Sequence, residues 1–187
     1  HYDALWMSFN PWSVETLTAH RSDLAAFRAA TINDGNSEMA LYRWDTITSA
    51  LWRLYTQQIE EVIFATADEG DDPRLPRSQH IKPWSILGQL SHLSEARDDC
   101  ERPCIVDVDI DYFAWQGLDR AFGQVFADDY VRQLGKCLKA GLDTGRFGVV
   151  TVALSPSTTG TWELAERLLA ILLEPFPEYV EFATGAP

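Results

Sequence analysis

The chain has 187 residues, of which 46% are hydrophobic and 23% are charged. This composition can bury a core and excludes a disordered or fibrous protein, and the length predicts one domain over residues 1–187. The formal net charge is −13, a field that repels nucleic acid and anionic lipid and attracts cationic substrates.

Helical spacing of apolar residues predicts two amphipathic helices in the first third of the chain, over Ser13–Ala30 and Glu38–Ile59. The short β-branched run Glu61–Thr66 predicts a buried strand. The next stretch, Ala67–Pro83, is polar, contains prolines and opens with four acidic residues. It indicates a long functional loop within the domain.

The rest of the chain alternates helices with strands. Strands that are apolar on both sides and alternate with helices imply parallel pairing through right-handed crossovers. The sequence therefore predicts a three-layer α/β protein with its chemistry at the carboxyl ends of the strands. Gly145 is placed to end the second helix of this part. The expected helices are Ser85–Ala96, Asp128–Leu142 and Trp162–Leu173, and the expected strands are Cys104–Phe113 and Phe147–Leu154.

Neither apolar runs nor cysteines point to a membrane or secreted protein. The longest apolar runs, such as 168–173, are far shorter than the ~20 residues of a membrane span. Three cysteines are an odd number, which argues against a disulfide framework and favours a cytoplasmic location. The chain begins at His1 and not at Met, which indicates a processed protein or a fragment.

Three aspartates at alternate positions, Asp107, Asp109 and Asp111, form the most informative motif. In a strand these carboxylates share one face, while the apolar residues between them pack on the other. Carboxylates at this spacing repel one another, and hard divalent cations such as Mg²⁺ and Mn²⁺ choose oxygen ligands. The motif predicts a metal site, and the alternative is an exposed strand edge with solvated aspartates.

Two further segments carry weaker candidates. His1 and Asp3 share a face if the start of the chain is extended, and His with Asp is a usual pair of Mn²⁺ or Fe²⁺ ligands. The alternative for this segment is a frayed terminus. Ser155 begins a Ser/Thr/Gly turn after a strand and could line a substrate pocket, although such turns also cap helices.

Taken together, Asp107-Val-Asp-Ile-Asp-Tyr-Phe, followed after a helix by Thr151-Val-Ala-Leu-Ser-Pro and Gly160-Thr-Trp, resembles the arginase-like branch of the ureohydrolase superfamily, which includes peptide arginases. The resemblance covers mainly residues 100–165. It implies an arginase-like three-layer fold with a mainly parallel sheet flanked by helices. It also implies hydrolysis of arginine side chains, in a ribosomally made precursor peptide, to ornithine and urea.

The resemblance further implies a centre of two Mn²⁺ ions. His1 and Asp3 match two of its ligands, and a third ligand of that segment would precede His1. The strand supplies either Asp109 and Asp111 or Asp107 and Asp109. An arginine-containing precursor peptide is the implied partner, attracted by the acidic surface and stacked on tryptophans.

The implied reaction is metal-assisted hydrolysis, in which hydroxide attacks the guanidinium carbon and the leaving amine is protonated. A carboxylate must hold the planar guanidinium, because the donors of that group match a carboxylate fork. Glu163 is the first candidate, followed by Glu69 and Asp71 on the long loop. His80 or His92 could carry the proton.

Two other functions compete with this one. A haloacid-dehalogenase-type phosphohydrolase also places an Asp-x-Asp and a later Ser at strand ends, as Asp107, Asp109 and Ser155 could be read, with Mg²⁺ assistance. A non-catalytic arginase-like module would bind a peptide without turning it over. A copper site of the histidine-brace type at His1 would require a β-sandwich, whereas this chain is predicted to be rich in helices.

Overall fold

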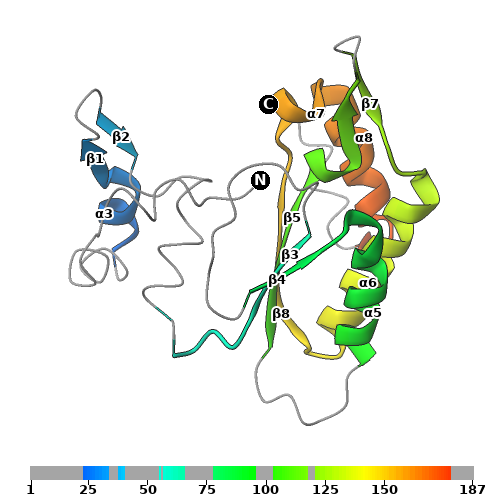
Figure 1. Cartoon of the computed structure of the whole chain (residues 1–187), viewed down its shortest axis with the longest axis horizontal. Helices are drawn as coiled ribbons and strands as arrows, with labels where there is room; N and C mark the ends of the chain where they lie inside the picture. Colours follow the sequence, from blue (N-terminus) through cyan, green and yellow to red (C-terminus); the bar gives the residue numbers. More distant parts are fainter. Residues whose placement is uncertain are drawn as a thin grey trace. The chain divides into compact units, whose positions relative to one another are not determined.

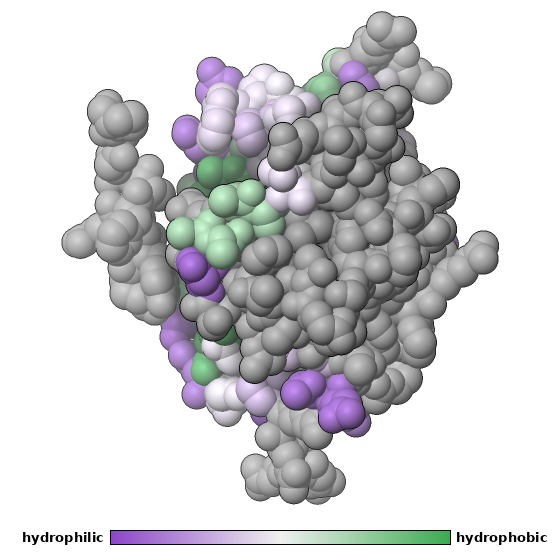
Figure 2. Space-filling view, turned by 90° about the vertical axis from the view of Figure 1, so that its left-hand side faces the viewer, coloured by the Kyte–Doolittle hydropathy of each residue, from purple (hydrophilic) through white to green (hydrophobic). Residues whose placement is uncertain are grey.

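The structure, a computed structural model, describes residues 23–33, 38–40, 55, 57–65, 78–95, 103–117 and 121–177. It divides into two compact units, His1–Pro83 and Trp84–Pro187 (Figure 1). The described residues form a mixed α/β structure, as the sequence predicts. None of the helices in these ranges combines the length and the apolarity needed to cross a membrane. On the face drawn in Figure 2, hydrophilic and hydrophobic residues are interspersed among the coloured residues.

The described part of the first unit begins with a short helix and a hairpin. Asp23 caps helix α3, Leu24–Ala29, by accepting hydrogen bonds from two backbone N–H groups at 2.9 and 3.1 Å. Because the backbone of Asp23 is extended, the prediction of one helix over residues 13–30 is wrong there. Strands β1, Thr31–Asn33, and β2, Glu38–Ala40, pair antiparallel. The helix predicted from residue 38 is therefore wrong at its start, since pairing with β1 overrides the helical spacing.

A second pair of strands in this unit is parallel. Strand β3, Val62–Ala65, confirms the strand predicted over residues 61–66, and Val62 lies opposite Ser78 of strand β4, Ser78–Ile81. Strand β4 falls in the segment predicted to be a loop, so that prediction is wrong for these four residues. Its two central side chains are polar and exposed, which hides the strand from a search for apolar alternation.

The second unit confirms most of the predicted elements, including helix α8 with the predicted bounds. Gly145 has a φ of +71° and follows the end of α6, as predicted. The strand predicted to reach Phe113 ends at Asp109, and a hairpin, β6–β7, and a short helix, α7, were not predicted. The elements are η1 (Pro83–Ser85, at the boundary of the units), α5 (Ile86–Glu95), β5 (Cys104–Asp109), η2 (Ile110–Phe113), β6 (Ala114–Gln116), β7 (Phe122–Gln124), α6 (Asp128–Asp143), β8 (Phe147–Ala153), α7 (Pro156–Thr159) and α8 (Trp162–Leu173).

Strands β5 and β8 pair in parallel, as predicted, and helices α5, α6 and α8 lie on one side of the pair (Figure 1). Alternate side chains of both strands pack against the core on that side. The opposite face is open at Ile105, which is 78% exposed, and at Val149, which is 48% exposed. The largest fully buried side chains of the core are Phe113, Phe147, Ile110, Leu138, Leu168, Leu172 and Val131.

Two glycines of α6 allow its close approach to neighbouring elements. A Cβ atom on Gly135 would lie 2.1 Å from the backbone oxygen of Leu172 in α8. A Cβ atom on Gly141 would lie 2.2 Å from the ring of Phe147 in β8. Because no real Cβ contact is this short, α6 can pack at this distance only with glycine at both positions.

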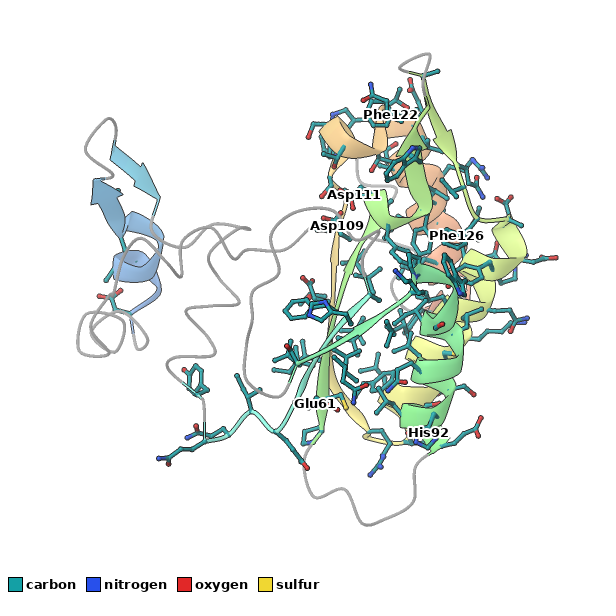
Figure 3. All side chains as sticks on the ribbon, viewed as in Figure 1. Glu61, His92, Asp109, Asp111, Phe122 and Phe126 are labelled. Carbon is teal, nitrogen blue, oxygen red and sulfur yellow. The ribbon has the colours of Figure 1, made fainter. Side chains whose placement is uncertain are left out.

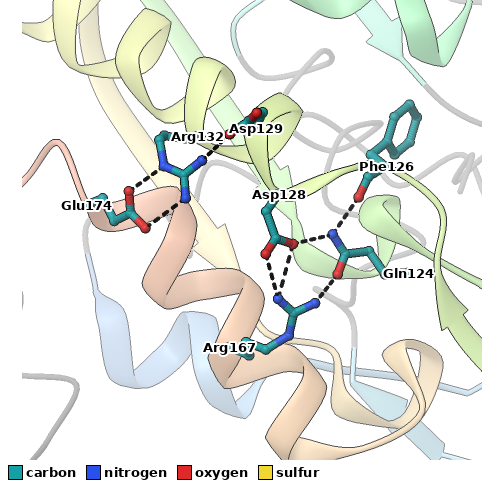
Figure 4. A network of polar contacts seen from close by, with 7 residues as sticks. All are labelled: Gln124, Phe126, Asp128, Asp129, Arg132, Arg167 and Glu174. Atoms are coloured by element: carbon teal, nitrogen blue, oxygen red, sulfur yellow. Dashed lines mark hydrogen bonds and ion pairs between the residues drawn. The ribbon is translucent and has the colours of Figure 1, made fainter.

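A polar network joins β7, α6 and α8 at the surface (Figure 4). The guanidinium of Arg167 donates to both oxygens of Asp128 at 3.1 Å and to the side chain of Gln124. Gln124 donates to Asp128 at 2.7 Å, and this bond, followed by the bond from Arg167, lowers the pKa of Asp128. Arg132 donates to Glu174 at 2.6 Å and thereby lowers the pKa of that carboxyl.

Candidate functional site at the ends of two parallel strands

The acidic motif lies where β5 ends (Figure 3). Val108 is buried in the core, so Asp107 and Asp109 lie on the opposite, open face of β5, as predicted. Asp107 is exposed, and Asp109 is half-buried. The strand stops after Asp109, which accepts a hydrogen bond from the backbone N–H of Asp111 at 3.3 Å.

The prediction that Asp111 lies on the same strand as Asp107 and Asp109 is wrong. Residues Ile110–Phe113 form the 3₁₀ helix η2, and Ile110 and Phe113 are both fully buried. Side chains three residues apart lie above one another in a 3₁₀ helix, so this turn buries both apolar residues, whereas a strand would send them to opposite faces. Asp111 therefore lies beside Asp109 because of this turn and not because of strand alternation.

Aromatic packing holds η2 in place. The ring of Tyr112 stacks on Phe126 with centroids 5.2 Å apart, and Phe126 stacks on Tyr130 at 4.5 Å. The hydroxyl groups of Tyr112 and Tyr130 lie 3.2 Å apart and share a hydrogen bond. Burial, followed by this contact, raises the pKa of Tyr112. Tyr112, the residue after Asp111, thus holds the η2 turn in place through its contacts with Phe126 and Tyr130.

Strand β8 supplies hydroxyl groups to the carboxylates of β5. Thr151 lies opposite Asp107 in the parallel pair, and its hydroxyl donates to Asp107 Oδ1 at 2.5 Å. Beyond the end of β8, Ser155 lies near Asp109, and its side chain lowers the pKa of that carboxyl. Asp107 is therefore contacted by a neutral donor from the adjacent strand, and Ser155 of the following turn lies near Asp109.

The environment of Asp109 disfavours its charge. Burial is the main cause of its raised pKa, and the like charges of Asp111 and Asp107 add to the effect. Hydrogen bonds from Ser155 and from the backbone of Asp111 act in the opposite direction and are outweighed. Within the described part of the chain, no Lys, Arg or His forms an ion pair with any of these three aspartates. A cation bound here would offset both the burial and the repulsion.

The turn after β8 holds Ser155 in an unusual conformation. With φ 42° and ψ 53°, Ser155 is the one non-glycine residue with positive φ among the described residues. This left-handed conformation costs an L-residue about 1–2 kcal/mol. Thr159, which is fully buried, donates to the backbone oxygens of Leu154 at 3.2 Å and of Ser155 at 2.9 Å. The buried hydroxyl closes the turn and supports the strained residue.

The structure brings together Asp107, Asp109, Asp111 and Ser155. Of the other predicted site residues, Glu163 lies exposed in the first turn of α8. His80 lies on β4 of the first unit, where its exposed ring stacks on Phe64 with centroids 5.4 Å apart. The predicted residues that fall outside the described ranges are His1, Asp3, Glu69 and Asp71.

The acidic residues suit a metal by chemistry but do not form a complete centre by themselves. Carboxylate and hydroxyl oxygens are the ligands that hard divalent cations prefer. Among the described residues, however, no three His, Cys, Asp or Glu side chains converge as a metal site requires. Any centre built on Asp109 therefore needs ligands in addition to those that the structure describes.

The sequence-based search missed Thr151. Its signal was a single hydroxyl in an otherwise apolar strand, Val149–Leu154. That signal becomes specific only once the register of β5 and β8 is known, because register decides which side chain lies opposite.

Comparison of the chain with protein-family models, with curated proteins and with solved structures gives no match.

Proposed function

We propose that the chain is a metal-dependent hydrolase that converts arginine side chains of a precursor peptide to ornithine with release of urea. The observation that supports this most strongly is that Asp107 and Asp109 near the end of β5, with Asp111 just after it, lie beside the parallel strand β8, whose Thr151 donates to Asp107. Such strand ends are where α/β enzymes place their sites. A parallel pair with helices on one side is compatible with an α/β fold, and the three-layer arginase-like arrangement is part of the proposal.

The proposal assigns Mn²⁺ to the acidic residues. Asp109, with Asp107 or Asp111, would hold the cation, and the sequence resemblance adds His1 and Asp3 for a pair of ions. When bound, Mn²⁺ lowers the pKa of water, so that hydroxide is available near neutral pH. Asp109 is half-buried, which limits the access of bulk water to its carboxylate.

The remaining roles belong to groups that handle the substrate. A carboxylate must hold the cationic guanidinium, and the exposed Glu163 is the described candidate, with Glu69 and Asp71 proposed from the sequence. Ser155 can donate or accept a hydrogen bond beside Asp109. From the sequence alone, His80 is proposed to protonate the leaving amine. The net charge of −13 favours approach of a basic peptide.

Metal content and product formation test this proposal. Purified protein is loaded with MnCl₂, dialysed and assayed for bound metal by inductively coupled plasma mass spectrometry. It is then incubated with arginine-containing peptides, and urea and ornithine are measured. We expect bound Mn²⁺ and urea release, both lost in Asp109→Asn. Asp143→Asn, which removes a surface aspartate paired with Lys139, is the control expected to behave as wild type.

A second candidate is the phosphohydrolase. It is favoured by the Asp-x-Asp at the end of β5 with Ser155 following the adjacent parallel strand β8. Hydrolysis of p-nitrophenyl phosphate with Mg²⁺, without urea release from peptides, would support it over the arginase-like reaction. Binding of Mn²⁺ and peptide without any product would support the non-catalytic module instead.

A further inference from the structure

We propose that the outer face of the β6–β7 hairpin is a docking surface for the arginine-containing peptide, with an arginine side chain of that peptide lying on the indole ring of Trp115. This surface, called the hairpin face below, is formed by Trp115, Gly123 and Val125. The inference rests on the proposed function for the identity of the peptide, but it involves no metal. It concerns exposed residues that the proposed hydrolytic reaction does not use.

The hairpin has one packed face and one open face. Phe122 packs on the turn between α7 and α8, because a Cβ atom on Gly160 would lie only 2.4 Å from the Cβ atom of Phe122. Successive side chains of a strand point to opposite faces, so Gly123 lies on the other face, together with Trp115, its partner in the antiparallel pair. Trp115 is 48% exposed. The outer face therefore presents a half-exposed indole ring beside a glycine.

The space over Gly123 is open. An aromatic ring opposite a strand glycine can fold over the glycine and shield its backbone. A ring in that position would contact a Cβ atom built on Gly123, yet such an atom meets nothing within 4 Å among the described residues. Val125, two residues further along, is 57% exposed, and its backbone N–H continues the pairing by donating to Phe113 at 2.8 Å. Two exposed apolar side chains thus border an unfilled space, as binding surfaces do.

The charges around the hairpin face fit a cationic partner. The charged residues in 103–117 and 121–131 are all aspartates. Those of the second range are paired with arginines, so the carboxylates of Asp109 and Asp111 supply most of the local negative charge. They lie just before β6 in the chain and at the same end of the second unit as Phe122 of the hairpin (Figure 3). The net charge of −13 attracts a basic peptide from a longer distance.

Arginine fits this surface better than other side chains do. Its planar guanidinium stacks on the face of an indole ring and is more weakly hydrated than the ammonium group of lysine. Its aliphatic stem packs along apolar surface while the charged end stays in water. The open space over Gly123, next to Val125, can receive that stem. The hairpin face therefore suits a peptide that presents an arginine between apolar or small residues.

Peptide binding tests the inference in the full chain, in buffer with EDTA so that metal plays no part. Fluorescence anisotropy follows the binding of a fluorescein-labelled peptide, Gly-Ser-Arg-Ile-Arg-Ser-Gly, and of the same peptide with citrulline in place of both arginines. Citrulline keeps the shape of arginine but carries no charge. We expect saturable binding of the arginine peptide and about fivefold or more weaker binding of the citrulline peptide.

Three variants locate the binding surface. Trp115→Ala removes the ring and should weaken binding of the arginine peptide about fivefold or more. Gly123→Val fills the open space and packs against the ring as a cross-strand neighbour, so it should weaken binding to a similar extent. Because valine favours strands and meets no obstacle at its Cβ atom, Gly123→Val should unfold at the wild-type temperature or above. Trp162→Ala removes an exposed tryptophan of α8 and should bind as wild type does.

Each remaining outcome has a defined meaning. Equal binding of the peptide by wild type, Trp115→Ala and Gly123→Val would overturn the inference, as would equal binding of the arginine and citrulline peptides or no saturable binding at all. If Trp115→Ala changes the mass measured by light scattering and leaves peptide binding unchanged, a second copy of the chain covers the hairpin face, and the inference falls. Binding that depends on Trp115, without urea release in Mn²⁺, would retain the inference and overturn the proposed function.

Discussion

Replacement of Gly135 by alanine should destabilise the second unit, although alanine is the better helix former. Gly135 lies in α6 where the helix crosses α8. The added Cβ would lie 2.1 Å from the backbone oxygen of Leu172 and 3.1 Å from its carbonyl carbon. Ordinary contact distances are longer by more than about 1 Å. The obstacle is backbone, so a change of rotamer cannot relieve it, and α8 must move.

The two opposing effects can be compared. Overpacking of this kind costs about 1–3 kcal/mol, and the upper half of that range applies because Leu172 itself is fully buried. The gain in helix propensity from glycine to alanine is about 1 kcal/mol. The free energy of unfolding should therefore fall by about 1–2 kcal/mol in Gly135→Ala.

Gly88→Ala is the matched control. Gly88 lies in α5, and a Cβ atom there meets nothing within 4 Å. This variant should gain up to about 1 kcal/mol from helix propensity alone. Urea unfolding followed by far-ultraviolet circular dichroism compares the two variants with wild type. If Gly135→Ala unfolds at a urea concentration equal to or higher than that of Gly88→Ala, the close packing of α6 on α8 is refuted.

Three further changes have defined outcomes. Because burial raises the pKa of Asp109, the stability linked to its protonation is present below about pH 4 and is lost as pH rises through the raised pKa. Urea unfolding without metal should therefore show that Asp109→Asn becomes more stable relative to wild type as pH rises above about 4. Arg167→Met removes the ion pair of Asp128, whose pKa is lowered in the fold. The variant should melt at a slightly lower temperature than wild type at neutral pH. This difference should disappear in high salt and as pH falls below about 4. Thr159→Val deprives the Leu154 carbonyl of a buried donor and should cost about 1–2 kcal/mol in urea unfolding; an unchanged midpoint would contradict this.

The elements that sequence reasoning predicted well are those with strong local signals. Helix α8 begins at the predicted residue because Thr161 caps it, accepting from the backbone N–H of Leu164 at 3.1 Å. The hairpin β6–β7 was missed because each of its strands has only three residues. Strand β4 was missed because a short strand with polar residues gains its stability from a partner distant in sequence, here β3. Local pattern carries no information on such partners.

The positions of the acidic residues of the site were predicted correctly only in part. Alternation placed Asp107 and Asp109 on one face correctly, because the apolar residues between them are buried in the core. It misplaced Asp111, because the burial of both Ile110 and Phe113 ends the strand in a 3₁₀ turn. The contribution of Thr151 could not be predicted, since it depends on the pairing of β5 with β8.

The hydrogen-bond donors that contact the aspartates help to explain how the second unit holds three acidic residues near one another. A lysine or arginine beside Asp109 would lower the repulsion by placing a positive charge next to the carboxylates. The donors present are the hydroxyl of Thr151 on Asp107 and the backbone N–H of Asp111 on Asp109, and neither donor carries a charge. The cost appears as the raised pKa of Asp109 and the strained backbone of Ser155. Such costs persist only where the surrounding structure is firm, and here the aromatic packing around η2 and the buried Thr159 provide that support.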